Sequence, residues 1–136
     1  MKLTGFYPVI GTHQLAESHA FYTEWLGFET TFEADWYVSL KHSDQPHFEL
    51  ALLQPDHPTV PEGFRTAAAG MLLNFEVADV DAQYQRLVVE GGHHPVLDIR
   101  SEDFGQRHFI IADPNGILID VITAIQPQGE YVEQYA

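Results

Sequence analysis

The pattern of hydrophobic and polar residues predicts a definite order of secondary-structure elements in the first part of the chain. An apolar run at 5–11 predicts a strand. Apolar residues then recur at helical spacing over 14–26, which predicts an amphipathic helix that Gly27 ends. Three further strand-like runs are separated by short polar breaks typical of hairpins, and they lie at 28–33, 36–42 and 46–54. This part therefore predicts a strand, a helix and three strands.

The same order of elements returns after a connecting segment. Residues 55–69 contain three prolines and no clear period, so we expect a loop there. A strand is then predicted at 71–77 and a helix at 79–91, with Asp79 as its N-cap. The remaining strands are expected at 94–99, 106–112 and 117–125, the last two joined by the turn Asp113-Pro114-Asn115-Gly116.

The two blocks align when Gln14 is placed on Asp79 and Gly27 on Gly92, so the chain repeats a pattern rather than a sequence. The half-modules are 5–54 and 71–125, followed by a tail at 126–136. A single half would leave one face of its sheet uncovered, and pairing two halves would bury a face and enclose a cavity. We therefore predict an α+β fold and one domain over residues 1–136. The pattern alone does not fix the topology.

Charge and composition narrow the class of protein. The 136 residues include 20 Asp and Glu but only 6 Lys and Arg, a formal net charge of −14, and no cysteine. The lack of cysteine excludes disulfides and metal–thiolate sites. The negative charge disfavours nucleic acid and anionic membranes as partners, and it would attract cationic small molecules. No apolar run is long enough to cross a bilayer and the N-terminus does not resemble a signal peptide, so we expect a cytoplasmic protein.

Three motifs occur along the chain in a specific order. They are Phe21-Tyr22-x-x-x-Leu26-Gly27-Phe28, then Asn74 to Asp81, then Phe104 to Arg107 followed by the turn at Asp113. Together they resemble the vicinal oxygen chelate superfamily, which includes glyoxalase I, extradiol dioxygenases and bleomycin-resistance proteins. The resemblance covers about residues 5–125. It implies paired βαβββ modules that form a curved mixed sheet around a ligand cavity, and usually a homodimer.

Metal-dependent members of that superfamily bind a divalent ion at four strand positions, which the resemblance places at Tyr7, Glu49, Leu72 and Asp120. Both carboxylates are present, but tyrosine and leucine replace the usual histidine or glutamine. Leucine cannot ligate a metal, and a neutral tyrosine is a poor ligand near neutral pH. We therefore expect no metal and no other cofactor. An alternative metal site from His47, Glu49 and Asp120 stays open.

Two functions from different classes follow. The first is a binding protein without catalysis, similar to the metal-free bleomycin-resistance proteins, which would hold a cationic or aromatic small molecule between aromatic walls. Its candidate ligand-binding residues are Tyr7, Trp36, His47, Leu72, Asn74, Glu76 and Phe109, although each aromatic residue is also a candidate for the core. The second is a metal-dependent or divergent lyase, isomerase or dioxygenase of the same superfamily, with Glu49 or Asp120 as general base. Strand alternation leaves open whether His108 faces inward.

Overall fold

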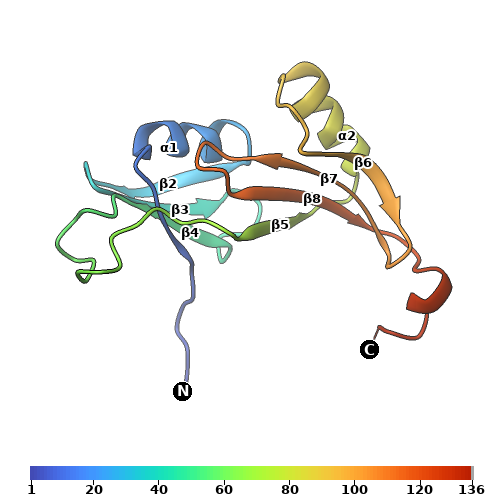
Figure 1. The fold of residues 1–136 in the computed structure, drawn as a ribbon, viewed down its shortest axis with the longest axis horizontal. Helices are drawn as coiled ribbons and strands as arrows, with labels where there is room; N and C mark the ends of the chain where they lie inside the picture. The colour runs from blue at the N-terminus through green and yellow to red at the C-terminus, as the bar shows by residue number, and fades with distance from the viewer. Residues whose placement is uncertain (136) are drawn as a thin grey trace. The chain divides into compact units, whose positions relative to one another are not determined.

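The computed structural model describes residues 1–135, and the chain forms two compact units, Met1–Ala69 (unit 1) and Gly70–Ala136 (unit 2). Each unit contains one four-stranded mixed sheet, and a helical segment lies on one face of that sheet (Figure 1). The α+β fold and the repeated order of strand, helix and three strands are therefore confirmed. One domain over residues 1–136 and a cavity between its halves stay predictions. The last residue of the predicted tail, Ala136, lies outside the described residues.

Unit 1 builds its sheet in the order β1-β4-β3-β2, with β1 parallel to β4 and the other pairs antiparallel. The first strand is shorter than predicted, because Pro8 has no N–H to donate and only its carbonyl joins the ladder, accepting from Ala51. Residues 55–69 contain no helix or strand, as expected. The elements are β1 (Val9–Gly11), α1 (Leu15–Glu24), β2 (Phe28–Glu33), β3 (Tyr37–His42) and β4 (Glu49–Leu53).

The core of unit 1 lies between α1 and the sheet. Phe21 and Tyr22 are buried on the helix, and the Tyr22 ring meets the Phe28 ring edge-on at 6.0 Å. Gly27 turns the chain from α1 into β2 with a φ of 81°. A Cβ at this position would lie 3.0 Å from His42 Nε2, so both the backbone conformation and the close approach favour glycine.

Unit 2 repeats the arrangement in the order β5-β8-β7-β6, with β5 parallel to β8. The Asp79 side chain accepts from the Ala82 N–H and caps the helix as predicted. The predicted helix continues beyond Tyr84 as a π-helix, and the strand predicted at 94–99 starts only at Leu97. The elements are β5 (Leu72–Glu76), α2 (Val80–Tyr84), the π-helix η1 (Gln85–Glu90), β6 (Leu97–Glu102), β7 (Gln106–Ala112), β8 (Leu118–Ala124) and the 3-10 helix η2 (Gly129–Tyr131).

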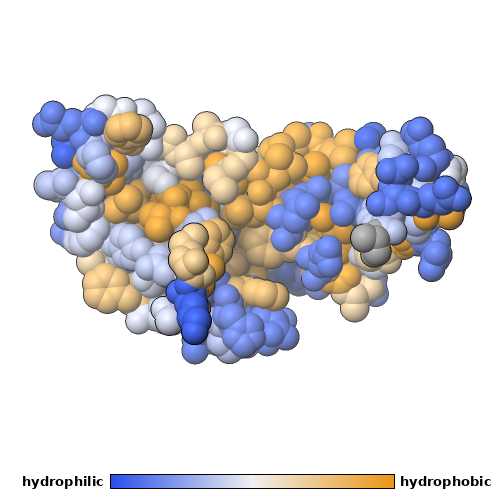
Figure 2. Space-filling view, turned by 90° about the horizontal axis from the view of Figure 1, so that it is seen from below, coloured by the Kyte–Doolittle hydropathy of each residue, from blue (hydrophilic) through white to orange (hydrophobic). Residues whose placement is uncertain are grey.

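We call the sheet face that carries no helix the open face of each unit. Residues paired across neighbouring strands point to the same face, so the register assigns each side chain. Figure 2, a view from below, shows hydrophobic residues at the surface. On the open faces, the register places Val9 of unit 1 and Leu72 of unit 2, which are 44% and 51% exposed. Within residues 1–135, no helix has the length and apolar character needed to cross a membrane.

Candidate functional site

The open face of unit 2 carries three of the predicted ligand-binding residues and the predicted catalytic residue Asp120. Leu72, Asn74 and Glu76 alternate along β5, and all three are exposed. The ladder sets Asn74 beside Asp120 of β8, so these two side chains share a face. Asp120 is only 6% exposed, so it is a buried acid beside the exposed polar residues of β5.

Asp120 is held by a histidine that the sequence left unassigned. In the β7–β8 hairpin, His108 is paired with Ile122, which places its ring on the face of Asp120. The His108 Nδ1 lies 2.8 Å from Asp120 Oδ1, and its Nε2 lies 2.8 Å from Glu102 Oε2. His108 is itself only 5% exposed. A neutral imidazole can donate from one nitrogen only, so two carboxylate partners fit the imidazolium, which donates from both.

Arg100 completes a network of four charged side chains on this face. Its Nε donates to Glu102 Oε2 at 2.8 Å, and Glu102 joins it to His108 and Asp120. Burial alone lowers the pKa of His108, but its hydrogen bonds to Glu102 and Asp120 outweigh burial and raise that pKa above the ordinary 6.5. The bonds from His108 and Arg100 lower the pKa of Glu102. We call these four residues the unit 2 network, and its two cations balance its two anions.

The unit 2 network limits what Asp120 can do. One of its oxygens already accepts from a buried cation, so the residue adds little net negative charge to the open face. Leu72, at the first-strand position of the family's metal set, offers no ligand atom. Within the described part of the chain, no three His, Asp or Glu side chains are grouped to hold a metal ion. The residues at these positions in unit 2 therefore do not fit the family's metal centre.

The open face of unit 1 is aromatic. Tyr37 of β3 is half-buried beside Leu53 in the ladder, and Phe32 of β2 lies with its ring centroid 6.4 Å from that of Tyr37. Burial raises the pKa of Tyr37, and the neighbouring Tyr7 hydroxyl raises it further. Tyr7 and Phe32 are 49% and 53% exposed. Two phenols and a benzene ring therefore form an accessible, uncharged surface.

A hollow of about 560 Å³ lies beside this aromatic surface within unit 1. The sheet contributes Val9, Gly11 and Leu53, and the 55–69 loop contributes Phe64 and other apolar or small residues. The loop is anchored on β1, since the Ala68 N–H donates to the Gly11 carbonyl at 2.8 Å. No charged side chain lines the hollow among the described residues. The long loop thus has a definite place, as one wall of an apolar hollow.

The other predicted residues of unit 1 lie apart from the hollow. Glu49 is exposed at the start of β4, opposite Lys41 in the ladder, and His47 is exposed in the preceding turn. Trp36 is half-buried and stacks on His57, with ring centroids 3.6 Å apart and planes 7° apart. Trp36 therefore already has an aromatic partner, and His47 and Glu49 are not brought into a group with it.

Phe109 of unit 2 lies on the covered face rather than the open face. It is 0% exposed, and its ring meets Tyr84 of α2 edge-on at 5.3 Å. Its place in the structure is the core between helix and sheet. The sequence left the direction of His108 open, and it did not single out Glu102 or Arg100. The turn at Asp113–Gly116 was a usable signal, because a tight hairpin fixes the β7–β8 register and puts His108 and Asp120 on one face.

Comparisons with known proteins agree with this architecture. A model of the Glyoxalase/Bleomycin resistance protein/Dioxygenase superfamily matches residues 6–121. A comparison with curated protein sequences found no match. Among solved structures, lactoylglutathione lyase from Agrobacterium tumefaciens is 19% identical with a TM-score of 0.70, covering 90% of this chain and 95% of its own. TnmS3, an antibiotic binding protein from Streptomyces sp. CB03234, is 20% identical with a TM-score of 0.68, and the match covers 90% of this chain and 97% of TnmS3. Virulence protein STM3117 from Salmonella typhimurium is 19% identical with a TM-score of 0.72, and the match covers 92% of this chain and 100% of STM3117.

Proposed function

Because the chain belongs to the Glyoxalase/Bleomycin resistance protein/Dioxygenase superfamily, we propose that it is a small-molecule-binding member of that superfamily that works without the family metal. Its ligand is an aromatic compound with a cationic group, held in the hollow of unit 1. The observation that carries this proposal is the apolar hollow of about 560 Å³ beside the exposed Tyr7 and Phe32.

The chemistry of the hollow supports a flat, largely apolar guest. Its volume falls within the range of about 300–1,000 Å³ typical of small-molecule sites. Phe64 is 74% exposed on the loop wall, so an aromatic guest would cover it and gain burial. Tyr7 and Tyr37 can face a cation with their rings, a contact of about 0.5–2 kcal/mol. The net charge of −14 attracts such a cation at long range.

Binding of proflavine, a flat aromatic cation, tests the proposal by fluorescence titration. We expect Phe64→Ala to weaken binding about tenfold, since the lost contact is worth roughly 1.4 kcal/mol. Phe48→Ala is the matched control, because Phe48 is also a largely exposed phenylalanine (62%) but does not line the hollow. Equal effects of the two substitutions, or a preference for the anion 2-naphthalenesulfonate over proflavine, would show that this hollow is not the ligand site.

A second candidate function is a lyase, isomerase or dioxygenase with Asp120 as general base. The observation in its favour is the chain of hydrogen bonds from Asp120 through His108 to the more accessible Glu102, which offers a route for a proton. Turnover of a hemithioacetal or a catechol that Asp120→Asn abolishes would favour this function. Turnover that is absent or unaffected by Asp120→Asn leaves the binding function in place.

We also propose that the protein acts as a homodimer in the cytoplasm. Apolar side chains on the open faces, among them Val9 and Leu72, supply surface that a second copy could bury. Sedimentation at micromolar concentration tests the dimer, and a single monomeric species there would exclude it. The cytoplasmic location rests on the sequence and stays a prediction.

A further inference from the structure

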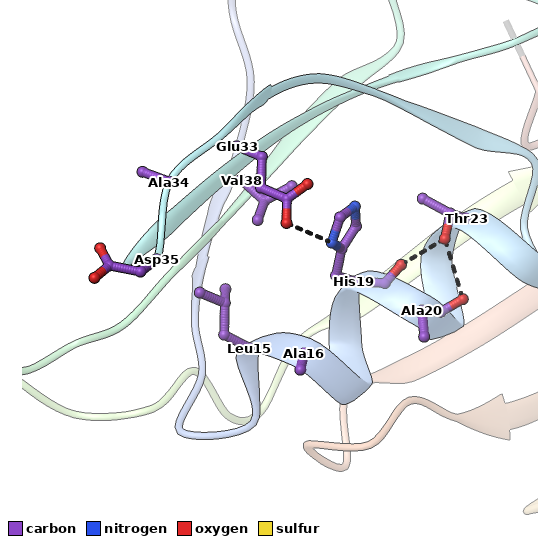
Figure 3. A pocket seen from close by; sticks show the side chains of 9 residues that line it. All are labelled: Leu15, Ala16, His19, Ala20, Thr23, Glu33, Ala34, Asp35 and Val38. Atoms are coloured by element: carbon purple, nitrogen blue, oxygen red, sulfur yellow. Dashed lines mark hydrogen bonds and ion pairs between the residues drawn. The ribbon is translucent and has the colours of Figure 1, made fainter.

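Unit 1 has a second hollow, of about 380 Å³, on the helix side of its sheet. It lies between α1 and the end of the β2–β3 hairpin, as Figure 3 shows. The residues that matter for its chemistry are Ala16, His19, Ala20, Glu33, Asp35 and Val38. None of these residues is assigned to the proposed function. We call this space the outer hollow.

The outer hollow exists because α1 presents small side chains there. Ala16 and Ala20 are one helical turn apart and therefore lie on the same side of the helix. The Thr23 hydroxyl donates back to the His19 carbonyl at 2.8 Å, which leaves its methyl group to line the space. With Val38 of β3, these groups make an apolar floor. The volume falls within the range of about 300–1,000 Å³ of small-molecule sites.

The side chains of His19 and Glu33 face one another above this floor. His19 Nε2 lies 2.7 Å from the Thr30 hydroxyl oxygen. In the neutral tautomer that keeps its proton on Nε2 and donates it to Thr30, His19 Nδ1 carries a lone pair, and this is the tautomer that a cationic donor would select. Nδ1 and Glu33 Oε2 are 4.0 Å apart, too far for a direct hydrogen bond, and Figure 3 shows them directed toward each other. One N–H₂ group placed between them could donate to both.

The charge of the outer hollow also favours a cation. Glu33 and Asp35 contribute two carboxylates, and no Lys or Arg is among the described residues that line it. Within residues 1–135, neither Glu33 nor Asp35 forms an ion pair with a Lys or Arg side chain. A guanidinium offers N–H₂ groups in a planar fork that matches carboxylate geometry, while a short alkyl chain suits an alanine and valine floor.

We propose that the outer hollow is a second binding site, for an alkylguanidinium group. One N–H₂ of the guanidinium donates to His19 Nδ1 and Glu33 Oε2, Asp35 adds negative charge at the rim, and the alkyl chain lies over Ala16, Ala20 and Val38. The site is independent of the proposed function, because its residues lie on the other side of the unit 1 sheet.

Calorimetric titration with n-butylguanidinium tests the site, with n-butylurea as the neutral isostere. We expect the urea to bind at least about tenfold more weakly, because it lacks the charge that strengthens the hydrogen bonds to Glu33. Glu33→Gln should weaken guanidinium binding by a similar factor. Glu29→Gln is the matched control, since Glu29 is on the same strand but pairs with Lys41 on the opposite face. It should leave binding unchanged.

Ala20→Leu provides a second variant that changes volume and not charge. Leucine is tolerated in helices, so α1 should still form, while the larger side chain fills the outer hollow and abolishes binding. Equal binding of the urea and the guanidinium would overturn the proposal, as would equal losses in Glu33→Gln and Glu29→Gln or full binding by Ala20→Leu. Proflavine binding is measured on the same variants. It should be unchanged, because the hollow lined by Phe64 is on the other face of the sheet.

Discussion

Replacing His108 with glutamine tests the unit 2 network. The imidazolium makes two hydrogen bonds of 2.8 Å to carboxylates, and its removal leaves Asp120, only 6% exposed, without a cation among its described neighbours. Breaking a buried ion pair by removing one partner destabilises a protein by about 3–5 kcal/mol. Glutamine can still donate one hydrogen bond, so we expect a loss of about 3 kcal/mol in the free energy of unfolding at pH 6.

The loss should depend on pH with a definite sign. The pKa of His108 is raised by folding, so its contribution is complete below its unfolded pKa, about 6.5. The contribution disappears as the pH rises through the higher folded pKa. The pKa of Glu102 is lowered below 4.5, so its contribution is present above 4.5 and disappears as the pH falls further. The unit 2 network therefore stabilises the fold most between about pH 4.5 and 6.5.

Urea unfolding of the wild type and His108→Gln at pH 6 and pH 9 measures this effect. The difference between them should shrink from about 3 to about 1 kcal/mol as His108 loses its charge. His94→Gln is the matched control, because His94 is an exposed histidine of the same unit and should change little at either pH. A difference under about 1 kcal/mol at pH 6, or one that is the same at both pH values, would refute the network reasoning.

Three further outcomes are expected. Phe109→Ala should lower the free energy of unfolding by about 3–5 kcal/mol in urea titrations, because it empties a fully buried site under Tyr84. A loss under about 1 kcal/mol would show that Phe109 is not part of the core. Asp79→Ala should lower it by about 1 kcal/mol through the lost helix cap, whereas Asp79→Asn, which can still cap, should change it far less. Elemental analysis of protein purified without chelator should find no stoichiometric divalent metal, since Leu72 cannot ligate; one metal per chain that Glu49→Ala releases would contradict this.

The order of elements could be predicted from the sequence because it depends on local signals. The Asp79 cap, the Gly27 turn and the hairpin turn at Asp113 each act over a few residues, and the structure has all three. The length of β1 was overestimated, because hydrophobicity alone does not show where Pro8 interrupts the ladder. The switch to a π-helix after Tyr84 had no signal in the apolar spacing.

The site was harder to predict because it depends on which face each residue occupies. The sequence named Asp120 and Asn74 as candidates, and the register places them side by side. The sequence left Phe109 as a candidate for either the ligand site or the core. In the structure, His108 faces the open side and Phe109 faces the helix, since adjacent strand residues alternate. A shift of one residue in the assumed register exchanges the two faces. The loop at 55–69 has no periodicity, so its role as a wall of the hollow could not be read from sequence.

The position of the first strand in each unit bears on how the units fold. In both sheets this strand sits at the edge and pairs in parallel with the last strand of its own unit, β1 with β4 and β5 with β8. The other three strands are joined by short hairpins, whose contacts close small loops and form quickly. The first strand can pair only after the helix and the hairpins have brought the last strand into place. This pairing closes a longer loop and therefore costs more loop-closure entropy. Amide protons of Val9–Gly11 should therefore exchange with solvent sooner than those of β3 and β4, so that each sheet opens first at the strand with which its sequence begins.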